Sequence, residues 1–425
     1  MMRLLLAAVV FFSASCLAKP TNQLVILTTF TEDALQPVLL AFKKHHPETH
    51  FRVIHRRVIS GMRLLSQNGH DIDIVLSSTL SLFNALNEQR TLLPLNELSY
   101  DSSFQQQRFM QHTLKNVAIF GYSGYGLMWN SDYLVKHQLP QPTNWESLTE
   151  PLYFRHLVMS SPARSGTTHM MVENILQQHG WKYGWQLLLQ IGGNLSSVSA
   201  RSYGVADTIA RGLAGIGPII DSYAYESEKL FPFIGFSYQN NSPLMPSYVA
   251  AIKNINQATH SIEFIKFLLS DEVQQSLSTS AMNKHALNQT INQPFEVAPL
   301  NLQLMHQRST LVKQLFEQTI NQQLIRLNQA WQLIHKVKKL NHLTQAETRQ
   351  FNLALKLAST PPVSKVQAQD PQLLTAITMA RSDVETMKYT KLWRQLMAEQ
   401  LEQAITICEQ LLNAHEYRSA HDATP

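Results

Sequence analysis

Cysteine is scarce in this chain, and the shortage limits how the fold can be stabilised. The 425 residues include only Cys16 and Cys408. If the N-terminal segment is removed on export, as argued below, Cys408 is the last thiol left. A single thiol excludes an internal disulfide, so the fold must depend on its core.

Charged residues are also few, and neither sign dominates. They make up 15% of the chain, and Lys plus Arg exceed Asp plus Glu by 35 − 30 = 5. Proteins that bind nucleic acid concentrate basic side chains in a patch, whereas here the only cluster is Lys336, Lys338 and Lys339. The sequence therefore predicts no nucleic-acid partner. Apolar residues reach 44%, which is enough for a large core and two or three domains.

Beyond the N-terminus the chain has no apolar run long enough for a membrane helix. Met1 to Ala18 contains Arg3, then the apolar stretch Leu4 to Phe12, then small residues. This order is typical of a secretory signal peptide, and the run is too short to span a bilayer. We expect residues 1–18 to be cleaved and the protein to be exported to the periplasm. Cys16 leaves a lipid anchor open as an alternative.

The N-terminal half alternates short apolar strands with amphipathic helices. Strands are predicted at 24–30, 51–56 and 71–78, with helices at 31–46 and 60–67 between them. A second section of the same kind runs from about 120 to 222. The fold class is therefore α/β with parallel sheets. Ligands of such sheets bind beyond the carboxyl ends of the strands, where Thr29 and Ser78 lie.

The last part of the chain has a different character. From about residue 300 the pattern is helical with almost no glycine, interrupted by the Ser-Thr-Pro-Pro stretch that begins at Ser359. We interpret residues 299–425 as a C-terminal helical extension. We expect deletion of the residues after about 305 to leave ligand binding intact but to abolish signalling.

One hydroxyl-rich loop precedes a helix in the second section. Ser165, Gly166, Thr167 and Thr168 follow a predicted strand, with Arg164 beside them. The free N–H groups and positive dipole of a helix start favour an anion, and a small residue lets it approach. Capping of the helix by Ser or Thr is an equally weighted alternative.

Two further segments of this section carry candidate ligand contacts. Arg201 and Ser202 precede a helix, and Asp221 ends a predicted strand at the expected ligand face. A basic and an acidic side chain around a hydroxyl-rich loop suit a small molecule with anionic and hydroxyl groups. A structural ion pair between Arg201 and Asp221 is the alternative.

The block from Thr167 to Ala224, TTHMMVENILQQHGWKYGWQLLLQIGGNLSSVSARSYGVADTIARGLAGIGPIIDSYA, resembles the periplasmic solute-binding proteins of the iron and phosphosugar type, and within them the phosphoglycerate regulatory group. The resemblance extends from about Leu24 to Asn292. It implies a two-lobed periplasmic binding protein (type 2) fold. Lobe 1 is expected at 19–118 and 225–298, and lobe 2 at 119–224. The glycine-rich stretch 121–126 is predicted to cross between the lobes.

The resemblance also implies a function and a set of site residues. The protein is expected to bind phosphoglycerate or a related phosphorylated metabolite and to act on a membrane sensor histidine kinase that controls phosphoglycerate uptake. Delivery of phosphosugar or ferric iron to an ABC importer is the alternative. The implied ligand-binding residues are Thr29, Ser78, Ser165, Gly166, Thr167, Thr168, His169, Arg201, Ser202 and Asp221.

Neither a metal nor a cofactor is predicted. The iron-binding branch holds its metal with adjacent tyrosines, whereas Tyr223 and Tyr225 are separated by one residue. On the expected strand their rings would share one face, which leaves iron open as an alternative. His46 and His50 are interpreted as surface histidines, because Pro47 ends the helix between them.

Catalysis is not expected either. The G-x-S-x-G motif fails at Tyr125, and Asp71 and Asp73 have no recognisable partner acid or base. A phosphate-ester hydrolase is therefore the least favoured hypothesis.

Overall fold

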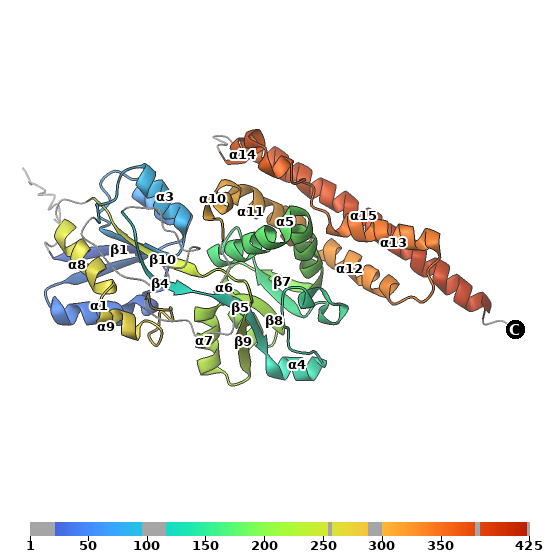
Figure 1. The fold of residues 1–425 in the computed structure, drawn as a ribbon, viewed down its shortest axis with the longest axis horizontal. Coiled ribbons are helices and arrows are strands. Elements are labelled where there is room, and N and C mark those ends of the chain that lie inside the picture. Colours follow the sequence, from blue (N-terminus) through green and yellow to red (C-terminus); the bar gives the residue numbers. More distant parts are fainter. Residues whose placement is uncertain (1–21, 96–115, 254–256, 288–299, 379–382, 423–425) are drawn as a thin grey trace, which may run out of the picture.

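The computed structural model describes residues 22–95, 116–253, 257–287, 300–378 and 383–422. The predicted signal peptide and Cys16 lie outside the described residues. Two five-stranded sheets form the centres of two lobes, with strand orders β2-β1-β3-β10-β4 and β7-β6-β8-β5-β9. Figure 1 shows lobe 1 in blue and yellow, lobe 2 in green and the C-terminal helices in orange and red.

Lobe 1 forms where the sequence alternates strands and helices. Its strands are β1 (Gln23–Thr28), β2 (His50–His55), β3 (Ile74–Ser77), β4 (Ala118–Ser123) and β10 (Met245–Ala251). Its helices are α1 (Glu32–His45), α2 (Val58–Leu65), α3 (Leu80–Glu88), α8 (Ala258–Leu268) and α9 (Asp271–Ser276). β1 pairs in parallel with β2 and β3, and α1 buries the stripe Leu35, Val38, Leu39 and Phe42, as its spacing predicts. Asp73 accepts the N–H of Val25 at 2.8 Å, so this carboxylate supports the sheet.

Lobe 2 repeats the plan around a second sheet. Its strands are β5 (Tyr125–Asn130), β6 (Leu157–Ser160), β7 (Leu195–Ser199), β8 (Ile216–Ile220) and β9 (Ile234–Tyr238). Its helices are α4 (Ser131–His137), η2 (Ser147–Thr149), η3 (Pro151–Tyr153), α5 (Gly166–Asn194), α6 (Ser202–Ala210) and α7 (Asp221–Leu230). α5 is kinked at Gly180, whose φ of 74° lies in the left-handed region that favours glycine.

Within the described residues, the chain passes directly from one sheet to the other at two places. Gly124 joins β4 to β5, and residues 239–244 join β9 to β10. The predicted crossing at 121–126 is therefore correct, but the lobe boundaries are not, because 119–123 belong to lobe 1 and 225–238 to lobe 2. A Cβ at Gly124 would lie 2.5 Å from Cε1 of Tyr238, so only glycine fits at this crossing.

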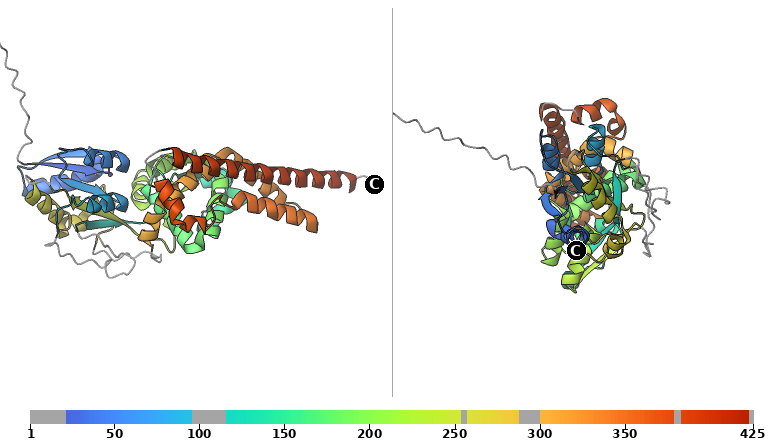
Figure 2. Two further views of the ribbon diagram at one scale, coloured as in Figure 1. Left: turned by 90° about the horizontal axis from the view of Figure 1, so that it is seen from above. Right: turned by 90° about the vertical axis from the view of Figure 1, so that its left-hand side faces the viewer.

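The C-terminal extension consists of helices, as predicted. They are α10 (Leu302–Gln307), α11 (Ser309–Phe316), the π-helical segment η4 (Glu317–Asn321), α12 (Leu324–Lys338), α13 (Gln345–Ser359), η5 (Gln367–Gln369), α14 (Pro371–Thr378) and α15 (Asp383–Asp422). Figure 2 shows α13 and α15 running together beyond lobe 2, on the side away from lobe 1. Within the described residues, no helix is both long and apolar enough to cross a bilayer.

The extension shares a core with lobe 2. One continuous cluster of buried side chains includes Ile191 of α5, Leu327 of α12 and Leu401 of α15. The indole N–H of Trp181 in α5 donates to the carbonyl of Val363 at 2.8 Å. Truncation after residue 305 would therefore expose an apolar face of α5.

Paired glycines on α5 allow this close packing. A Cβ at Gly193 would lie 2.2 Å from Cδ1 of Trp331, and one at Gly192 would lie 2.9 Å from Leu327. The backbone of α5 thus forms part of the contact with α12. The carbonyls of Gly193 and Leu195 both accept from the amide of Asn328, at 2.9 and 3.0 Å.

We expect Gly193→Ala to destabilise the protein, because the added methyl overlaps Trp331. Overpacking of this kind costs about 1–3 kcal/mol, measurable by urea denaturation. Gly61→Ala in α2 is the matched control, since its Cβ would meet Leu27 at an ordinary 3.4 Å. Equal stability of the two variants would contradict the packing described.

Candidate functional site

Three helices begin close together where the lobes face each other. A Cβ at Gly166, the first residue of α5, would lie 3.5 Å from Oγ1 of Thr79, which precedes α3 in lobe 1. Oγ of Ser165 lies 3.2 Å from Oγ of Ser202, the first residue of α6. The positive ends of α3, α5 and α6 therefore converge, which favours an anion between the lobes.

Hydroxyl groups of the α5 loop are largely bonded to one another. Ser165 accepts the N–H of Thr168 at 3.2 Å, so capping is the correct interpretation for Ser165. Thr168 donates its hydroxyl to Ser165 at 3.0 Å and also contacts the hydroxyl of Ser160, which keeps this buried side chain inside the lobe. Thr167 points its hydroxyl toward Sδ of Met245, at 3.9 Å, at the start of β10.

Backbone donors remain at the start of α5. Across the described ranges, no partner is found for the N–H groups of Gly166 and Thr167. Gly166 is exposed, so a ligand can approach the start of α5. The site at this helix is thus a pair of N–H donors beside a small residue, as an anion requires.

The lobe 1 candidates lie at strand ends, as expected. Thr29 follows β1 and donates its hydroxyl to Ser77 at 2.9 Å. Ser78 follows β3, and its Oγ lies 3.2 Å from Oγ of Ser247 on β10. Both are partly exposed, so the carboxyl ends of β1 and β3 present hydroxyl groups to lobe 2.

Arg201 is available for a ligand. It stands directly before α6, is partly exposed, and its guanidinium has no ion pair with any described residue. Burial raises the pKa of Tyr223, and the nearby charge of Arg201 opposes that rise, so these two side chains are neighbours. The predicted alternative, an Arg201–Asp221 ion pair, is not formed.

Asp221 lies in the crossing between the lobes rather than at an open ligand face. Its fully buried Oδ2 accepts the N–H of Gly124 and lies 3.1 Å from the hydroxyl of Tyr238. The same oxygen is 3.0 Å from Nε2 of His285, a residue of lobe 1. Asp221 therefore connects both lobes at the Gly124 crossing. Its other oxygen, Oδ1, has no hydrogen-bond partner among the described residues, so only this oxygen could accept a bond from a ligand.

The tyrosines considered for iron are on a helix, not on a strand. Asp221 begins α7, so Tyr223 and Tyr225 are about 200° apart around its axis. Tyr225 instead bonds the hydroxyl of Tyr238 at 2.7 Å. The expected shared face is wrong, because the strand β8 ends one residue before Asp221.

His169, one of the predicted ligand contacts, lies inside the protein. It is 4% exposed and lies near two cations of the C-terminal extension. Burial, with the charges of Lys313 and Arg308, holds the pKa of His169 well below its usual value. The side chain of His169 is therefore buried on the side of α5 that faces the C-terminal extension.

Lys284 is a further candidate for the site that the sequence pattern does not indicate. Its ammonium is buried, donates to Oγ of Ser123 at 2.9 Å and lies 4.9 Å from the centre of the Phe30 ring. Burial lowers the pKa of Lys284 to about 8, while the charge of Asp221 opposes this fall. An ammonium has three donors, and Ser123 takes one, so a ligand anion can take another. Lys284 lies in a loop, where no helical or strand periodicity of the sequence marks a residue as buried.

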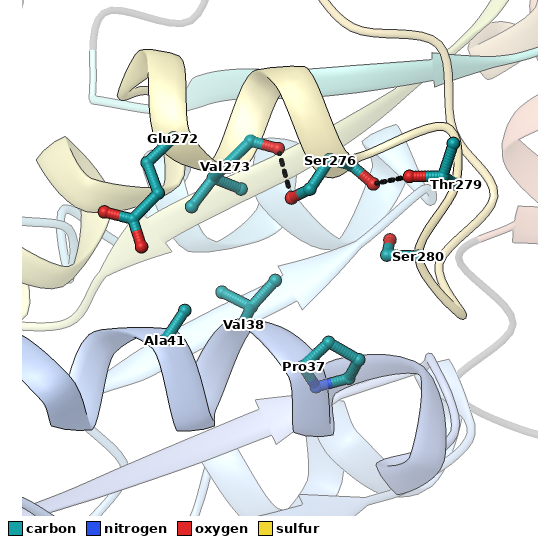
Figure 3. Close-up of a pocket in the computed structure, with 8 residues that line it drawn as sticks. All are labelled: Pro37, Val38, Ala41, Glu272, Val273, Ser276, Thr279 and Ser280. Carbon is teal, nitrogen blue, oxygen red and sulfur yellow. Dashed lines mark hydrogen bonds between the residues drawn. The ribbon is translucent and has the colours of Figure 1, made fainter.

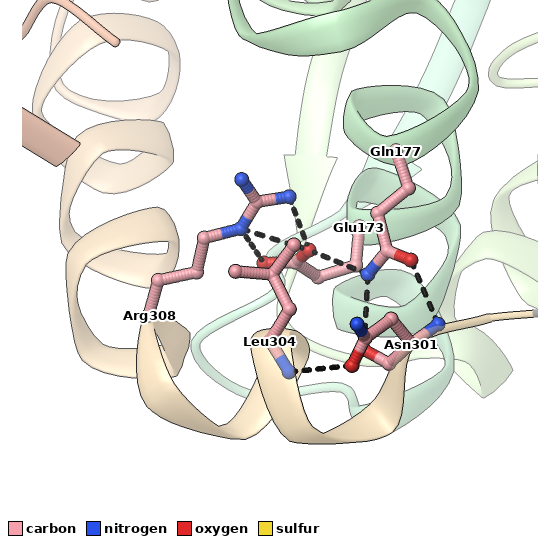
Figure 4. A network of polar contacts seen from close by, with 5 residues as sticks. All are labelled: Glu173, Gln177, Asn301, Leu304 and Arg308. Atoms are coloured by element: carbon pink, nitrogen blue, oxygen red, sulfur yellow. Dashed lines mark hydrogen bonds and ion pairs between the residues drawn. The ribbon is translucent and has the colours of Figure 1, made fainter. Parts of the chain in front are cut away.

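A buried ion pair connects α5 to the extension just below the loop. Nη2 of Arg308 lies 2.7 Å from Oε2 of Glu173, and Nε contacts both carboxylate oxygens at 3.1 Å (Figure 4). Beside it, Gln177 and Asn301 exchange bonds of 3.2 and 2.8 Å. The loop itself is also held, because Ser161 donates to Glu317 of η4 at 3.3 Å.

A separate pocket of about 380 Å³ lies between α1 and α9 (Figure 3). None of the predicted site residues lines it. Its only charged lining residue is Glu272, so it does not suit a phosphate. The converging helix starts are therefore the better candidate for an anion site.

Comparison with known proteins agrees with this architecture. The phosphoglycerate transport regulatory protein PgtC of Salmonella typhimurium is 33% identical over 389 residues, which are 88% of this chain and 94% of the relative. Among solved structures, the periplasmic binding protein AfuA of Actinobacillus pleuropneumoniae, with fructose-6-phosphate bound, has a TM-score of 0.57 and 16% identity, covering 73% of this chain and 97% of AfuA. The apo ferric ion-binding protein A of Pasteurella haemolytica has a TM-score of 0.56 and 12% identity, covering 70% and 97%.

These likenesses confirm the predicted fold class, a two-lobed type 2 periplasmic binding protein with a helical extension, and indicate an exported, periplasmic protein that binds a small solute. Residues 72–301 match the family described as bacterial extracellular solute-binding protein. With that match and the PgtC relative, this chain belongs to the bacterial extracellular solute-binding proteins of the iron and phosphosugar type.

Proposed function

We propose that this protein is a periplasmic sensor that binds phosphoglycerate, or a closely related phosphorylated metabolite, without chemical turnover. On binding, it regulates phosphoglycerate transport through a membrane sensor histidine kinase. Export by the signal peptide at residues 1–18 is part of this proposal. The observation that carries it is the convergence of three helix starts with Arg201 and Lys284 between the lobes.

The chemistry of the site favours a ligand with two anionic ends. Gly166 and Thr167 offer N–H donors and Arg201 a guanidinium on lobe 2, which together suit a phosphate. Lys284 offers an ammonium on the lobe 1 side, near the crossing. Phosphoglycerate carries a phosphate and a carboxylate, and the name of the relative PgtC points to the same compound.

The extension supports a sensory role. The loop that precedes α5 contacts Glu317 through Ser161, and the next turns of α5 are held by Arg308. Glu317 begins a π-helical segment, a feature often found at functional positions. A ligand at the start of α5 thus acts on a helix that shares its core with α12 and α15. Ligand-driven closure would present these helices to the kinase in a changed orientation.

Thermal unfolding tests the ligand class. The mature protein is heated with 2- and 3-phosphoglycerate, phosphoenolpyruvate, hexose phosphates, inorganic phosphate or ferric citrate. A ligand that binds the native state raises Tm with the logarithm of its excess over Kd. A selective shift with three-carbon phosphates supports the proposal. A shift with hexose phosphates or iron alone would instead favour the ABC importer role.

We expect Arg201→Ala to weaken binding of the three-carbon phosphates by about 1.5–3 kcal/mol, as for a lost charged hydrogen bond. Calorimetric titration measures the change. Arg211→Ala is the matched control, because Arg211 ends the same helix and is exposed beside Asp207. Wild-type affinity in Arg201→Ala would move the phosphate to another part of the cleft.

A further inference from the structure

Two histidines and a glutamate from distant parts of lobe 1 meet at the end of α1. The ligand atoms of His46, Glu48 and His260 all lie within 4.8 Å of one another. His46 follows α1, Glu48 lies in the turn before β2, and His260 is in the first turn of α8. The sequence suggests only His50 as a partner for His46, which is why His46 is interpreted there as a surface histidine. In the structure the second histidine of the cluster is His260, 214 positions away.

The imidazole of His260 is held in the orientation that a metal needs. Its Nδ1 lies 3.3 Å from Oε2 of Glu263, one turn further along α8. Its Nε2 faces the cluster, 4.0 Å from Oε1 of Glu48 and 3.1 Å from the hydroxyl of Thr49. A carboxylate on one ring nitrogen fixes the tautomer whose other nitrogen carries a lone pair, which here faces the Thr49 hydroxyl and the cluster and can bind a metal in place of that hydroxyl.

His46 is positioned by packing rather than by a hydrogen bond. Its ring stacks on Phe42, with centroids 4.3 Å apart and an angle of 13° between planes. The ring of His260 meets it edge-on at 5.7 Å. Glu48 has a half-exposed side chain, so its carboxylate can adjust without disturbing the core.

We propose that His46, Glu48 and His260 bind a divalent transition-metal ion, with zinc as the best match. Two imidazoles and a carboxylate are a common zinc donor set. Around tetrahedral zinc, donor atoms at about 2.0–2.1 Å from the metal lie roughly 3.4 Å apart, so the present spacing must contract by a small rotation of Glu48 and His46. Water or the nearby Thr49 hydroxyl completes the coordination.

The site lies at the opposite end of lobe 1 from the solute. α1 begins after the carboxyl end of β1, where Thr29 lies, and runs away from it to His46, next to the start of β2. The metal would join the α1–β2 turn to α8. It therefore stabilises lobe 1 and does not touch the ligand.

Zinc titration of the untagged protein after chelator treatment tests this. The wild type is expected to bind one zinc ion at this site by calorimetry and to gain thermal stability with zinc. Glu48→Gln and His46→Gln should each weaken binding at least tenfold, and His45→Gln, which alters the neighbouring exposed histidine, should not. Glu48 is exposed, so its variant keeps the fold even if the His46 variant does not.

Equal zinc affinity in the wild type and Glu48→Gln, or the absence of zinc binding by the wild type, would overturn the assignment. Phosphoglycerate affinity should be unchanged in Glu48→Gln. This second readout separates the metal site from the proposed solute site.

Discussion

Replacing Arg308 by alanine is expected to lower the free energy of unfolding by about 3–5 kcal/mol, because it leaves the carboxylate of Glu173 buried without its partner. Glu173 is fully buried and Arg308 is 8% exposed. The guanidinium also lies over the ring of Trp181 at 5.4 Å, so its loss removes packing as well. Urea denaturation with a probe of the C-terminal helices measures the effect.

Arg326→Ala is the control for this prediction. Arg326 forms an ion pair with Glu402 at 2.9 Å, but both side chains are about half exposed, so the expected loss is about 0–1 kcal/mol. The double variant Glu173→Leu with Arg308→Met should recover much of the stability, since the buried carboxylate and its guanidinium partner are removed together. Equal stability of Arg308→Ala and Arg326→Ala would show that the extension is not clamped to lobe 2 at this position.

Replacing Lys284 by methionine is expected to weaken solute binding by about 2–5 kcal/mol, as when one partner of a desolvated charge pair is removed. The ammonium is buried beside Ser123 and Phe30, so water compensates little for the lost contact. Calorimetric titration with 3-phosphoglycerate at pH 7 measures the change. Lys253→Met is the control, because this exposed lysine bonds the carbonyl of Arg90, away from the cleft.

The same lysine should make binding depend on pH. The pKa of Lys284 in the free protein is lowered to about 8, and an anionic ligand prefers the protonated form. Affinity should therefore be constant near pH 7 and decrease as the pH rises through 8, until the higher pKa of the bound state is reached. Lys284→Met should show no such decrease between pH 7 and 9. A wild-type affinity that is flat over this range would contradict the contact.

Local patterns in the sequence predict the lobes well, because each strand and helix buries one face. The spacing of Leu35, Val38, Leu39 and Phe42 predicts the core face of α1, and the order strand, loop, helix around Ser165 is as expected. What the pattern cannot supply is which sheet a strand joins. β4 and β9 are apolar strands that would suit either lobe, and the wrong boundaries arose there.

The features missed by sequence reasoning depend on contacts between distant residues. Asp221 looks like a strand-end ligand, yet it bonds Gly124, 97 residues away. The sequence around Lys284 and His260 does not indicate which distant residues these side chains contact. Gly192 and Gly193 lie near the end of α5, and only the fold shows that they pack against α12 and join the extension to lobe 2.

The central claim is that the converging helix starts bind the phosphate of a small metabolite. The most direct measurement is calorimetric titration of the wild-type protein with 3-phosphoglycerate and, in parallel, with glycerate. The account predicts one binding site for 3-phosphoglycerate and at least 100-fold weaker binding of glycerate, since the phosphate alone engages Gly166, Thr167 and Arg201. Equal affinity for the two compounds, or no binding of 3-phosphoglycerate, would contradict it.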